Sequence, residues 1–225
     1  MEIEPIAIYH CPLSSKFGIP RQSGVVPELE GTVTLCGRGP EALRGIEGFD
    51  YLWLLWGFSA NRPGRAGDTV RPPRLGGNKA VGVFASRSPY RPNPIGLSSV
   101  KLVAVEGCTL RVRGADLMDG TPIYDIKPYL PYADSHPGAR AGFTDASSWK
   151  RLEVVIPEAL EAVLERNAGP GAAKTVAGLL AEDPRPGYQD DPDRTYGMEF
   201  GGMDIRFRVA DGVLSVTEVA EGRRK

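Results

Sequence analysis

The sequence contains one dense cluster of basic residues, which is interspersed with prolines. Residues 62–91 hold seven basic side chains and one acid, Asp68, although the whole chain has a formal net charge of −1. Prolines at positions 72, 73, 89, 92 and 94 fix their own φ angles, so these cations stand on stiffened loops. Such a patch suits an anion: a phosphate, a carboxylate or an RNA backbone. A solvated loop balanced by acids elsewhere in the fold is the alternative.

A second stretch, residues 116–133, combines acids, one lysine and tyrosines between prolines. Asp119-Gly-Thr-Pro122 is typical of a turn, and an aspartate bonded to its own backbone would serve that turn without any ligand. Asp125 and Lys127 lie two residues apart, so on a strand they face the same side. They form either an ordinary ion pair or a base held beside a polarising cation.

A third stretch, residues 15–24, contains Pro20-Arg-Gln22. Pro20 has a fixed φ angle, Arg21 has a forked hydrogen-bond donor, and the Gln22 amide is able to pair with a base edge. An ordinary surface loop is the alternative.

Several common motifs are absent from the sequence. It has no GxGxxG or Walker loop, no CxxC or HExxH, no Gly-x-Ser-x-Gly elbow, and only two histidines. We therefore expect neither a Rossmann cofactor cradle nor a His-rich metal centre, and no metal at all.

Many short strands are expected to position these groups. The 28 glycines and 20 prolines are spread along the chain, which favours frequent turns. Alternating or bulky apolar runs predict strands at 4–10, 30–36, 50–58, 79–86, 97–105, 108–115 and 121–126, and Pro40 opens one or two helical turns at 40–44.

The character of the sequence changes at residues 131–146, which are rich in Ala, Gly, Ser and Pro. Beyond them we predict a strand at 151–156, helices at 157–167 and 172–181, and a hairpin whose arms, 204–210 and 213–219, flank Asp211-Gly212. The predicted domains are residues 1–137, mainly β, and 138–225, smaller and α+β.

The composition limits the function classes. The chain has 225 residues, of which 41% are hydrophobic and 24% charged, as expected for a globular protein. A uniformly basic nucleic-acid binder is excluded, and no apolar run approaches the ~20 residues of a membrane span. Three scattered cysteines fit reduced thiols in the cytoplasm.

Together, the three stretches resemble the TsaA-like (TrmO-type) tRNA methyltransferase family. The resemblance covers most of the chain and rests on these segments: Ile19-Pro-Arg-Gln22, Arg71-Pro-Pro-Arg-Leu-Gly-Gly-Asn78, Val83-Phe-Ala-Ser-Arg-Ser88, Arg91-Pro-Asn-Pro-Ile-Gly96, Asp119-Gly-Thr-Pro122, Asp125-Ile-Lys-Pro-Tyr-Leu-Pro131 and Asp183-Pro-Arg-Pro186. It implies a small β-barrel that binds S-adenosylmethionine without a Rossmann sheet. It further implies a cytoplasmic homodimer, with the cofactor near the subunit interface, that methylates N6 of threonylcarbamoyladenosine beside the tRNA anticodon.

The resemblance also implies which residues bind the cofactor. They are Pro20, Arg21, Gln22, Ser59, Ala60, Arg87, Leu97, Asp119, Gly120, Thr121 and Pro122. Where family members often carry a histidine, this chain has Ser59, which indicates backbone contacts instead. Arg87 suits the cofactor carboxylate by bidentate pairing, and Asp119 suits a ribose hydroxyl or the cofactor amine.

The catalytic candidates are Asp125, Tyr129 and Lys127. The acceptor N6 must lose a proton, for which Asp125 is the first candidate base and Tyr129 the second, with solvent as a further acceptor. Arg91 or Lys127 would pair with the threonyl carboxylate of the substrate.

The remaining cations are candidates for contact with tRNA. They are Arg71, Arg74, Lys79 and Arg91 on the first domain, Arg206 and Arg208 on the second, and the tail Arg223-Arg-Lys225, which solubility alone would also explain. Two other functions remain open: a non-catalytic barrel that binds an adenosine ligand or RNA, and a methyltransferase that acts on another substrate.

Overall fold

The structure is a computed structural model of the 225-residue chain. It describes residues 2–61, 67–72, 75, 79–145, 150–185 and 191–222. The predicted contacts of Arg74 and of the tail Arg223-Arg-Lys225 lie outside the described residues, as do Arg62 and Arg65.

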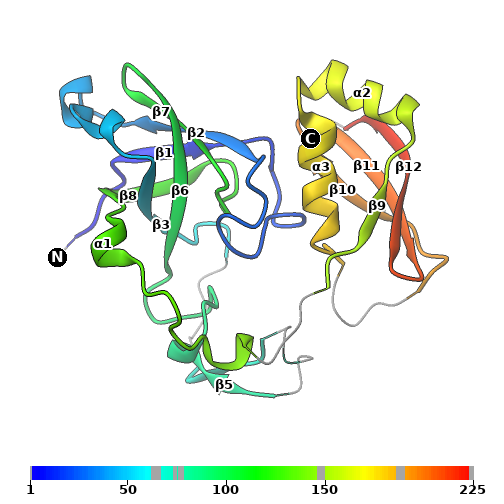
Figure 1. The fold of residues 1–225 in the computed structure, drawn as a ribbon, viewed down its shortest axis with the longest axis horizontal. Helices are drawn as coiled ribbons and strands as arrows, with labels where there is room; N and C mark the ends of the chain where they lie inside the picture. The colour runs from blue at the N-terminus through cyan, green and yellow to red at the C-terminus, as the bar shows by residue number, and fades with distance from the viewer. Residues whose placement is uncertain are drawn as a thin grey trace.

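Six antiparallel strands close into a barrel in the N-terminal part of the chain (Figure 1). The strands are β1 (Ala7–His10), β2 (Glu30–Leu35), β3 (Tyr51–Gly57), β6 (Ile95–Glu106), β7 (Thr109–Arg113) and β8 (Thr121–Pro128). Their order around the barrel is β1-β2-β7-β6-β3-β8, and β8 pairs with β1 to complete it. The predicted fold class is confirmed.

Alternation along β3 shows why this segment is a barrel strand. Leu52, Leu54 and Trp56 point into the barrel and are buried, whereas Tyr51 is exposed and Trp53 only half-buried. Bulky side chains at every second position bury one face of the sheet. The pairing of β3 with β8 shifts register between Leu55 and Trp56, a bulge of the kind that redirects side chains beside functional sites.

The strand predicted at residues 79–86 is wrong for most of its length. Only Val81–Gly82 (β5) is extended, pairing with Thr69–Val70 (β4), and Val83–Ala85 forms a 3₁₀ helix. Phe84 is 79% exposed, so this side chain has no core to hold it on a strand. The Ser86 hydroxyl donates to the Val83 carbonyl at 2.9 Å, which stabilises the turn instead.

The C-terminal part is a four-stranded sheet with two helices on one face (Figure 1). Its elements are β9 (Glu153–Val155), α2 (Glu158–Ala168), α3 (Ala172–Ala181), β10 (Tyr196–Phe200), β11 (Met203–Ala210) and β12 (Val213–Glu221). The sheet order is β10-β11-β12-β9, and only the β12–β9 pair is parallel. The predicted strand, helices and hairpin are found, and Asp211 and Gly212 both adopt the positive φ of that turn.

Three short elements escaped the sequence prediction. They are β10, the four-residue helix α1 (Pro131–Asp134) after the last barrel strand, and β4. In β10 the alternation of Tyr196, Met198 and Phe200, all buried, was the signal available. Further 3₁₀ helices lie at Pro40–Leu43, as predicted, and at Ile46–Gly48 and Gly142–Thr144.

The loop between β1 and β2 packs against the C-terminal sheet and helices (Figure 1). Leu13, Val26 and Leu29 are buried in the same cluster as the C-terminal core. The backbone N–H of Gly201 donates to the Pro12 carbonyl at 2.9 Å. The two parts of the chain therefore hold this loop, which carries Pro20-Arg-Gln22, between them.

Candidate functional site

A cavity with a volume of about 490 Å³ opens beside the barrel. Five segments enclose it: the β1–β2 loop, the end of β3 with the residues after it, residues 86–91, the start of β6, and the β7–β8 connection with the start of β8. The predicted cofactor residues that line it are Pro20, Arg21, Gln22, Ser59, Ala60, Arg87, Leu97 and Thr121. Arg91, a predicted substrate residue, lines it as well.

Arg87 and the Pro20-Arg-Gln22 segment contact each other across the cavity wall. The Arg87 guanidinium donates to the Gln22 side-chain oxygen, and the Gln22 amide donates to the Arg21 carbonyl. Arg21 also reaches the C-terminal part, where its guanidinium donates to the Asp183 carbonyl at 3.3 Å. Long cationic side chains are thus held in place rather than left freely rotating, which lowers the entropy lost when a ligand binds.

Arg91 stabilises the loop from which Arg87 projects. Its guanidinium donates to the Ser86 carbonyl at 3.2 Å and to the Ser88 carbonyl at 3.5 Å. These bonds close residues 86–91 into a compact turn. A guanidinium has five N–H donors, so Arg91 keeps donors for an anion in the cavity.

A buried polar chain forms the floor of the cavity. The Trp56 indole N–H donates to the Ser98 hydroxyl at 2.9 Å, and Ser98 in turn donates to a carboxylate oxygen of Asp116. Burial raises the pKa of the Asp116 carboxyl, although the Ser98 hydroxyl, backbone N–H groups and the charge of Arg87 act in the opposite direction. Asp116 was not among the predicted site residues, although its place in the acidic 116–133 stretch was a signal for it.

Apolar surface lies at the mouth of the cavity. Leu97 is 55% exposed and Ile95 40% exposed, and both line the opening. Gly96 stands between them because the Trp56 ring occupies the space where a side chain would be: an added Cβ would lie 2.2 Å from that ring. An apolar wall with a few polar groups beside it is the usual lining of a small-molecule site.

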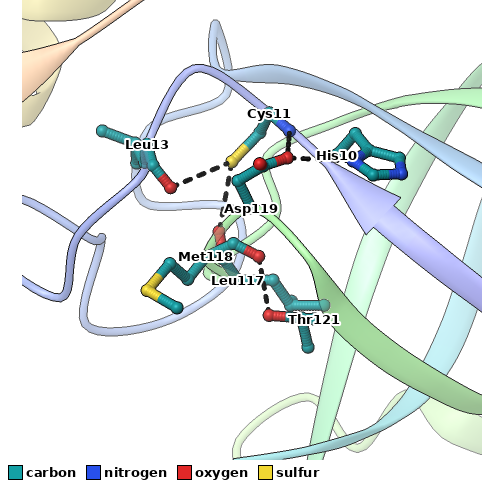
Figure 2. Close-up of polar contacts among 7 residues, drawn as sticks. All are labelled: His10, Cys11, Leu13, Leu117, Met118, Asp119 and Thr121. Atoms are coloured by element: carbon teal, nitrogen blue, oxygen red, sulfur yellow. Dashed lines mark hydrogen bonds and ion pairs between the residues drawn. The ribbon is translucent and has the colours of Figure 1, made fainter. Parts of the chain in front are cut away.

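The residues of the Asp119-Gly-Thr-Pro122 turn lie in two different places, one in the cavity lining and the others in the barrel wall. Thr121 lines the cavity, and its hydroxyl donates to the Met118 carbonyl at 2.6 Å (Figure 2). Asp119 lines a separate hollow instead. The Asp119 carboxylate contacts His10 Nδ1 at 3.0 Å and accepts from the Cys11 backbone N–H at 3.2 Å.

This turn also fastens the end of β1. Cys11 donates its thiol hydrogen to the Leu117 carbonyl at 3.5 Å, as Figure 2 shows. Gly120 has φ of +76°, which the turn requires, and Pro122 stands opposite Ile8 in the β1–β8 pairing. In this structure Asp119, Gly120 and Pro122 therefore join β1 to β8 and do not line the cavity.

The three catalytic candidates lie on or just after β8, beside the cavity rather than in its lining. Lys127 Nζ and a carboxylate oxygen of Asp125 form an ion pair at 2.8 Å, as two residues on one face of a strand allow. Tyr129 packs against Trp53, with ring centroids 5.6 Å apart, and Trp53 lines the cavity. Trp53 also stands opposite Lys127 in the β3–β8 pairing.

The described cations predicted to contact tRNA are exposed except for Arg91, which is half-buried in the cavity wall. Arg71 and Lys79 are exposed beside the short β4–β5 ribbon. Arg206 and Arg208 lie on the outer face of β11, where Arg206 pairs with Asp204 at 2.6 Å and Arg208 donates to the Thr195 hydroxyl at 3.1 Å.

Metal and membrane features are not found in the part of the chain that the structure describes. No group of three or more His, Cys, Asp or Glu side chains there is placed to hold a metal ion. No helix among the described residues is long and apolar enough to cross a membrane.

The fold and the cavity define a two-part protein: a closed six-stranded barrel that carries an arginine-lined cavity, followed by a small α+β unit. The chain belongs to the tRNA-methyltransferase O family, since the family's N-terminal domain matches residues 8–135 and its C-terminal domain matches residues 149–222. The resemblance noted in the sequence is thereby confirmed.

Relatives agree with this assignment along the whole chain. The chain is 38% identical over 226 residues to a tRNA (adenine(37)-N6)-methyltransferase of Escherichia coli K12, covering 96% of each protein. It is 39% identical to a putative S-adenosylmethionine-dependent methyltransferase of Pseudomonas aeruginosa, covering 98% of each. The crystal structure of TrmO from Pseudomonas aeruginosa superposes with a TM-score of 0.82 at 32% identity, covering 98% of each chain.

Proposed function

We propose that this protein transfers the methyl group of S-adenosylmethionine to N6 of threonylcarbamoyladenosine at the position beside the tRNA anticodon. The observation that carries the proposal is the single cavity into which Pro20-Arg-Gln22, Ser59-Ala60, Arg87 and Leu97 converge. The relatives named as tRNA (adenine(37)-N6)-methyltransferases and as S-adenosylmethionine-dependent methyltransferases support the reaction class.

The cavity fits S-adenosylmethionine in size and chemistry. Its volume of about 490 Å³ lies within the roughly 300–1,000 Å³ of small-molecule sites. Leu97 and Ile95 offer an apolar wall for the adenine ring, and Arg87 offers a forked donor for the carboxylate. When bound, the cofactor supplies a sulfonium-activated methyl group, so the chain's own residues contribute mainly alignment and exclusion of water.

Alignment falls to the rigid elements around the cavity. The β3–β6 pairing fixes Trp56 against Gly96, and the Arg91 bonds fix the loop that carries Arg87. We infer that the acceptor base enters from the side of Trp53, because this half-buried ring lines the cavity next to the β8 candidates. Lys127 is then placed to pair with the threonyl carboxylate of the substrate, and Arg91 is the alternative partner.

Proton removal from the acceptor N6 is assigned to Asp125. Asp125 pairs with Lys127 Nζ at 2.8 Å, so the candidate base stands beside the cation that is proposed to hold the substrate carboxylate. Removing such a base typically lowers turnover by roughly 10²–10⁴-fold. We expect Asp125→Asn to lose turnover on that scale while the affinity for S-adenosylhomocysteine stays unchanged.

The matched variant is Tyr129→Phe, which removes the second candidate base and keeps the ring against Trp53. Near-normal turnover of Asp125→Asn would reject the Asp125 assignment. A loss confined to Tyr129→Phe would transfer the role to the tyrosine, and normal turnover of both variants would leave solvent as the acceptor.

The tRNA backbone is proposed to follow the exposed cations Arg71 and Lys79, with Arg206 and Arg208 adding contacts from the second of the two proposed domains, residues 138–225. Because phosphate contacts release counterions, affinity should fall steeply with salt. A cytoplasmic location is part of the proposal, and a tRNA substrate together with the free cysteines supports it.

The protein is further proposed to act as a homodimer. Phe84, Tyr90 and Leu97 are 79%, 62% and 55% exposed on the barrel part, beside the cavity mouth or on loops near it. Exposed large apolar side chains of this kind gather at subunit interfaces. Sedimentation equilibrium should give twice the 24.2 kDa chain mass.

The decisive assay uses labelled S-adenosylmethionine and two preparations of the same tRNA, with and without the threonylcarbamoyl group. We expect transfer to the modified tRNA alone. Binding of the cofactor without transfer to either tRNA would favour a non-catalytic adenosine-binding barrel. Transfer to the unmodified tRNA would point to a methyltransferase with another substrate.

A further inference from the structure

One acidic side chain stands among the cations of the cavity. The described lining includes the basic residues Lys16, Arg21, Arg87 and Arg91, and Asp116 is the only Asp or Glu among them. A half-buried carboxylate on the floor of an arginine-lined cavity is not explained by the anion-binding role of the other side chains. The proposed function leaves Asp116 without a partner on the ligand.

The hydrogen bonds beneath Asp116 have a fixed direction. An indole N–H only donates, so Ser98 accepts from Trp56 and must use its own hydrogen toward Asp116. Ser98 is 1% exposed and Trp56 is 7% exposed, so water does not compete for these hydrogen bonds. The carboxylate is thus held in one orientation with acceptor capacity left over, because two carboxylate oxygens offer about four lone-pair sites.

The charge of Asp116 is incompletely balanced. Its donors are the Ser98 hydroxyl and backbone N–H groups of Asp116 and Ser23, and Arg87 adds a nearby positive charge. Burial nevertheless raises the pKa of this carboxyl. A cationic ligand group on the cavity side would offset that desolvation and stabilise the charged form.

The methyl donor carries two cations, and their chemistry differs. A sulfonium has no hydrogen to donate, whereas an α-ammonium has three N–H donors that need acceptors once they leave water. An oriented carboxylate with free lone pairs matches the ammonium. The α-carboxylate on the same carbon then needs a guanidinium close by, and Arg87 lines the same cavity.

We propose that Asp116 binds the α-ammonium of S-adenosylmethionine while Arg87 binds its α-carboxylate, so that the two side chains together recognise the amino-acid end of the cofactor. This inference rests on the proposed function. It adds a recognition residue outside the motifs from which the cofactor site was expected.

The test is calorimetric titration with S-adenosylmethionine, S-adenosylhomocysteine, the deamino analogue of S-adenosylhomocysteine, and 5′-methylthioadenosine, which lacks the amino-acid end. A hydrogen bond to a charged group contributes about 1.5–3 kcal/mol, so the natural protein should bind S-adenosylhomocysteine about 10- to 100-fold more tightly than the deamino analogue. In Asp116→Asn that preference should fall to about threefold or less, and 5′-methylthioadenosine should bind both proteins equally.

The matched control is Asp50→Asn, which removes an exposed carboxylate just before β3 and should keep the full preference. The asparagine at 116 keeps an oxygen for the Ser98 hydroxyl, and the melting temperature reports whether the variant folds. The comparison of the two ligands on the natural protein needs no variant at all, so absence of a preference there overturns the inference even if Asp116→Asn fails to fold.

The possible results distinguish a failure of the Asp116 assignment from a failure of the proposed methyltransferase function. If the natural protein binds neither S-adenosylmethionine nor S-adenosylhomocysteine, both the function and the inference fail. If it binds both but Asp116→Asn keeps the preference for the amine, only the inference fails. A loss shown with S-adenosylmethionine alone would assign Asp116 to the sulfonium, and an equal loss with 5′-methylthioadenosine would assign it to the nucleoside or to the fold; each overturns the proposal.

Discussion

At the scale of single residues, the cavity depends on one glycine as much as on its charged side chains. Gly96 faces the Trp56 ring across the β3–β6 pair, and a Cβ at this position would lie 2.2 Å from a ring carbon. Trp56 is 7% exposed and holds Ser98 through its indole N–H, so the ring has little freedom to move aside. The floor of the cavity therefore requires glycine at position 96.

We expect Gly96→Ala to lower the free energy of unfolding by about 1–3 kcal/mol, the usual effect of overpacking. It should also weaken S-adenosylhomocysteine binding, because a displaced Trp56 releases Ser98 and Asp116. Urea denaturation and calorimetry measure the two effects. Gly82→Ala is the control, since an added Cβ there meets no atom within 4 Å; equal stability of the two variants would contradict this account.

Some residues of the cavity were predictable from the sequence, and others were not. Resemblance to the family led to Arg87, Leu97 and the Pro20-Arg-Gln22 segment, which the fold gathers around one cavity. It did not lead to the chain from Trp56 through Ser98 to Asp116. Those three residues are 18 to 60 positions apart and come into contact only in the closed barrel. No local sequence pattern therefore predicts their hydrogen bonds.

At the scale of elements, the short helix α1 braces the cavity from outside. The Asp134 carboxylate accepts from the Leu130 backbone N–H at 2.9 Å and from the Trp53 indole N–H at 2.8 Å. These bonds, the backbone one foremost, hold the pKa of Asp134 below its ordinary value. Trp53 lines the cavity, so α1 fixes one of its walls.

Because the pKa of Asp134 is lowered on folding, its charge stabilises the native state at high pH and not at low pH. The stability difference between the natural protein and Asp134→Asn should be full above the ordinary aspartate pKa of 3.8. It should shrink as the pH falls through the lower pKa of the folded protein. Thermal melting of both proteins from pH 7 to pH 2.5 measures it; a difference that grows on acidification would contradict the assigned contacts.

The helices and strands differ in how well the local sequence predicts them. Strands such as β7 and β11 follow an apolar pattern of period 2, and the helices α2 and α3 follow one of period 3.6. Residues 79–86 carry an apolar run too, yet Val83 is buried while its neighbour Phe84 is 79% exposed, so the apolar pattern alone does not predict a strand here.

At the scale of the whole molecule, the β1–β2 loop links the two parts of the chain. Leu13, Val26 and Leu29 are buried among C-terminal side chains such as Leu179 and Phe207, more than 140 positions away along the sequence. Contacts of such range follow from the assembled fold and not from any local signal. The division at residue 137/138 stays a prediction, and the loop that carries Pro20-Arg-Gln22 belongs to the packing of both sides.

Leu29→Ala tests this link. Removing a fully buried leucine side chain typically lowers the free energy of unfolding by about 2–5 kcal/mol, and the loop should loosen enough to weaken S-adenosylhomocysteine binding as well. Ile3→Ala, at a side chain that is 51% exposed, should change stability by less than about 0.5 kcal/mol. Unfolding curves and titrations of both variants decide; an unchanged affinity in Leu29→Ala would show that the C-terminal part does not position the loop.

A crystal structure of the protein with S-adenosylhomocysteine would show whether the arginine-lined cavity of the barrel holds the methyl donor. We predict density for the whole ligand in contact with Gln22, Arg87 and Leu97, with the amino-acid end reaching Asp116. A ligand found at another place on the molecule, or an empty cavity in crystals grown at saturating ligand, would contradict the account.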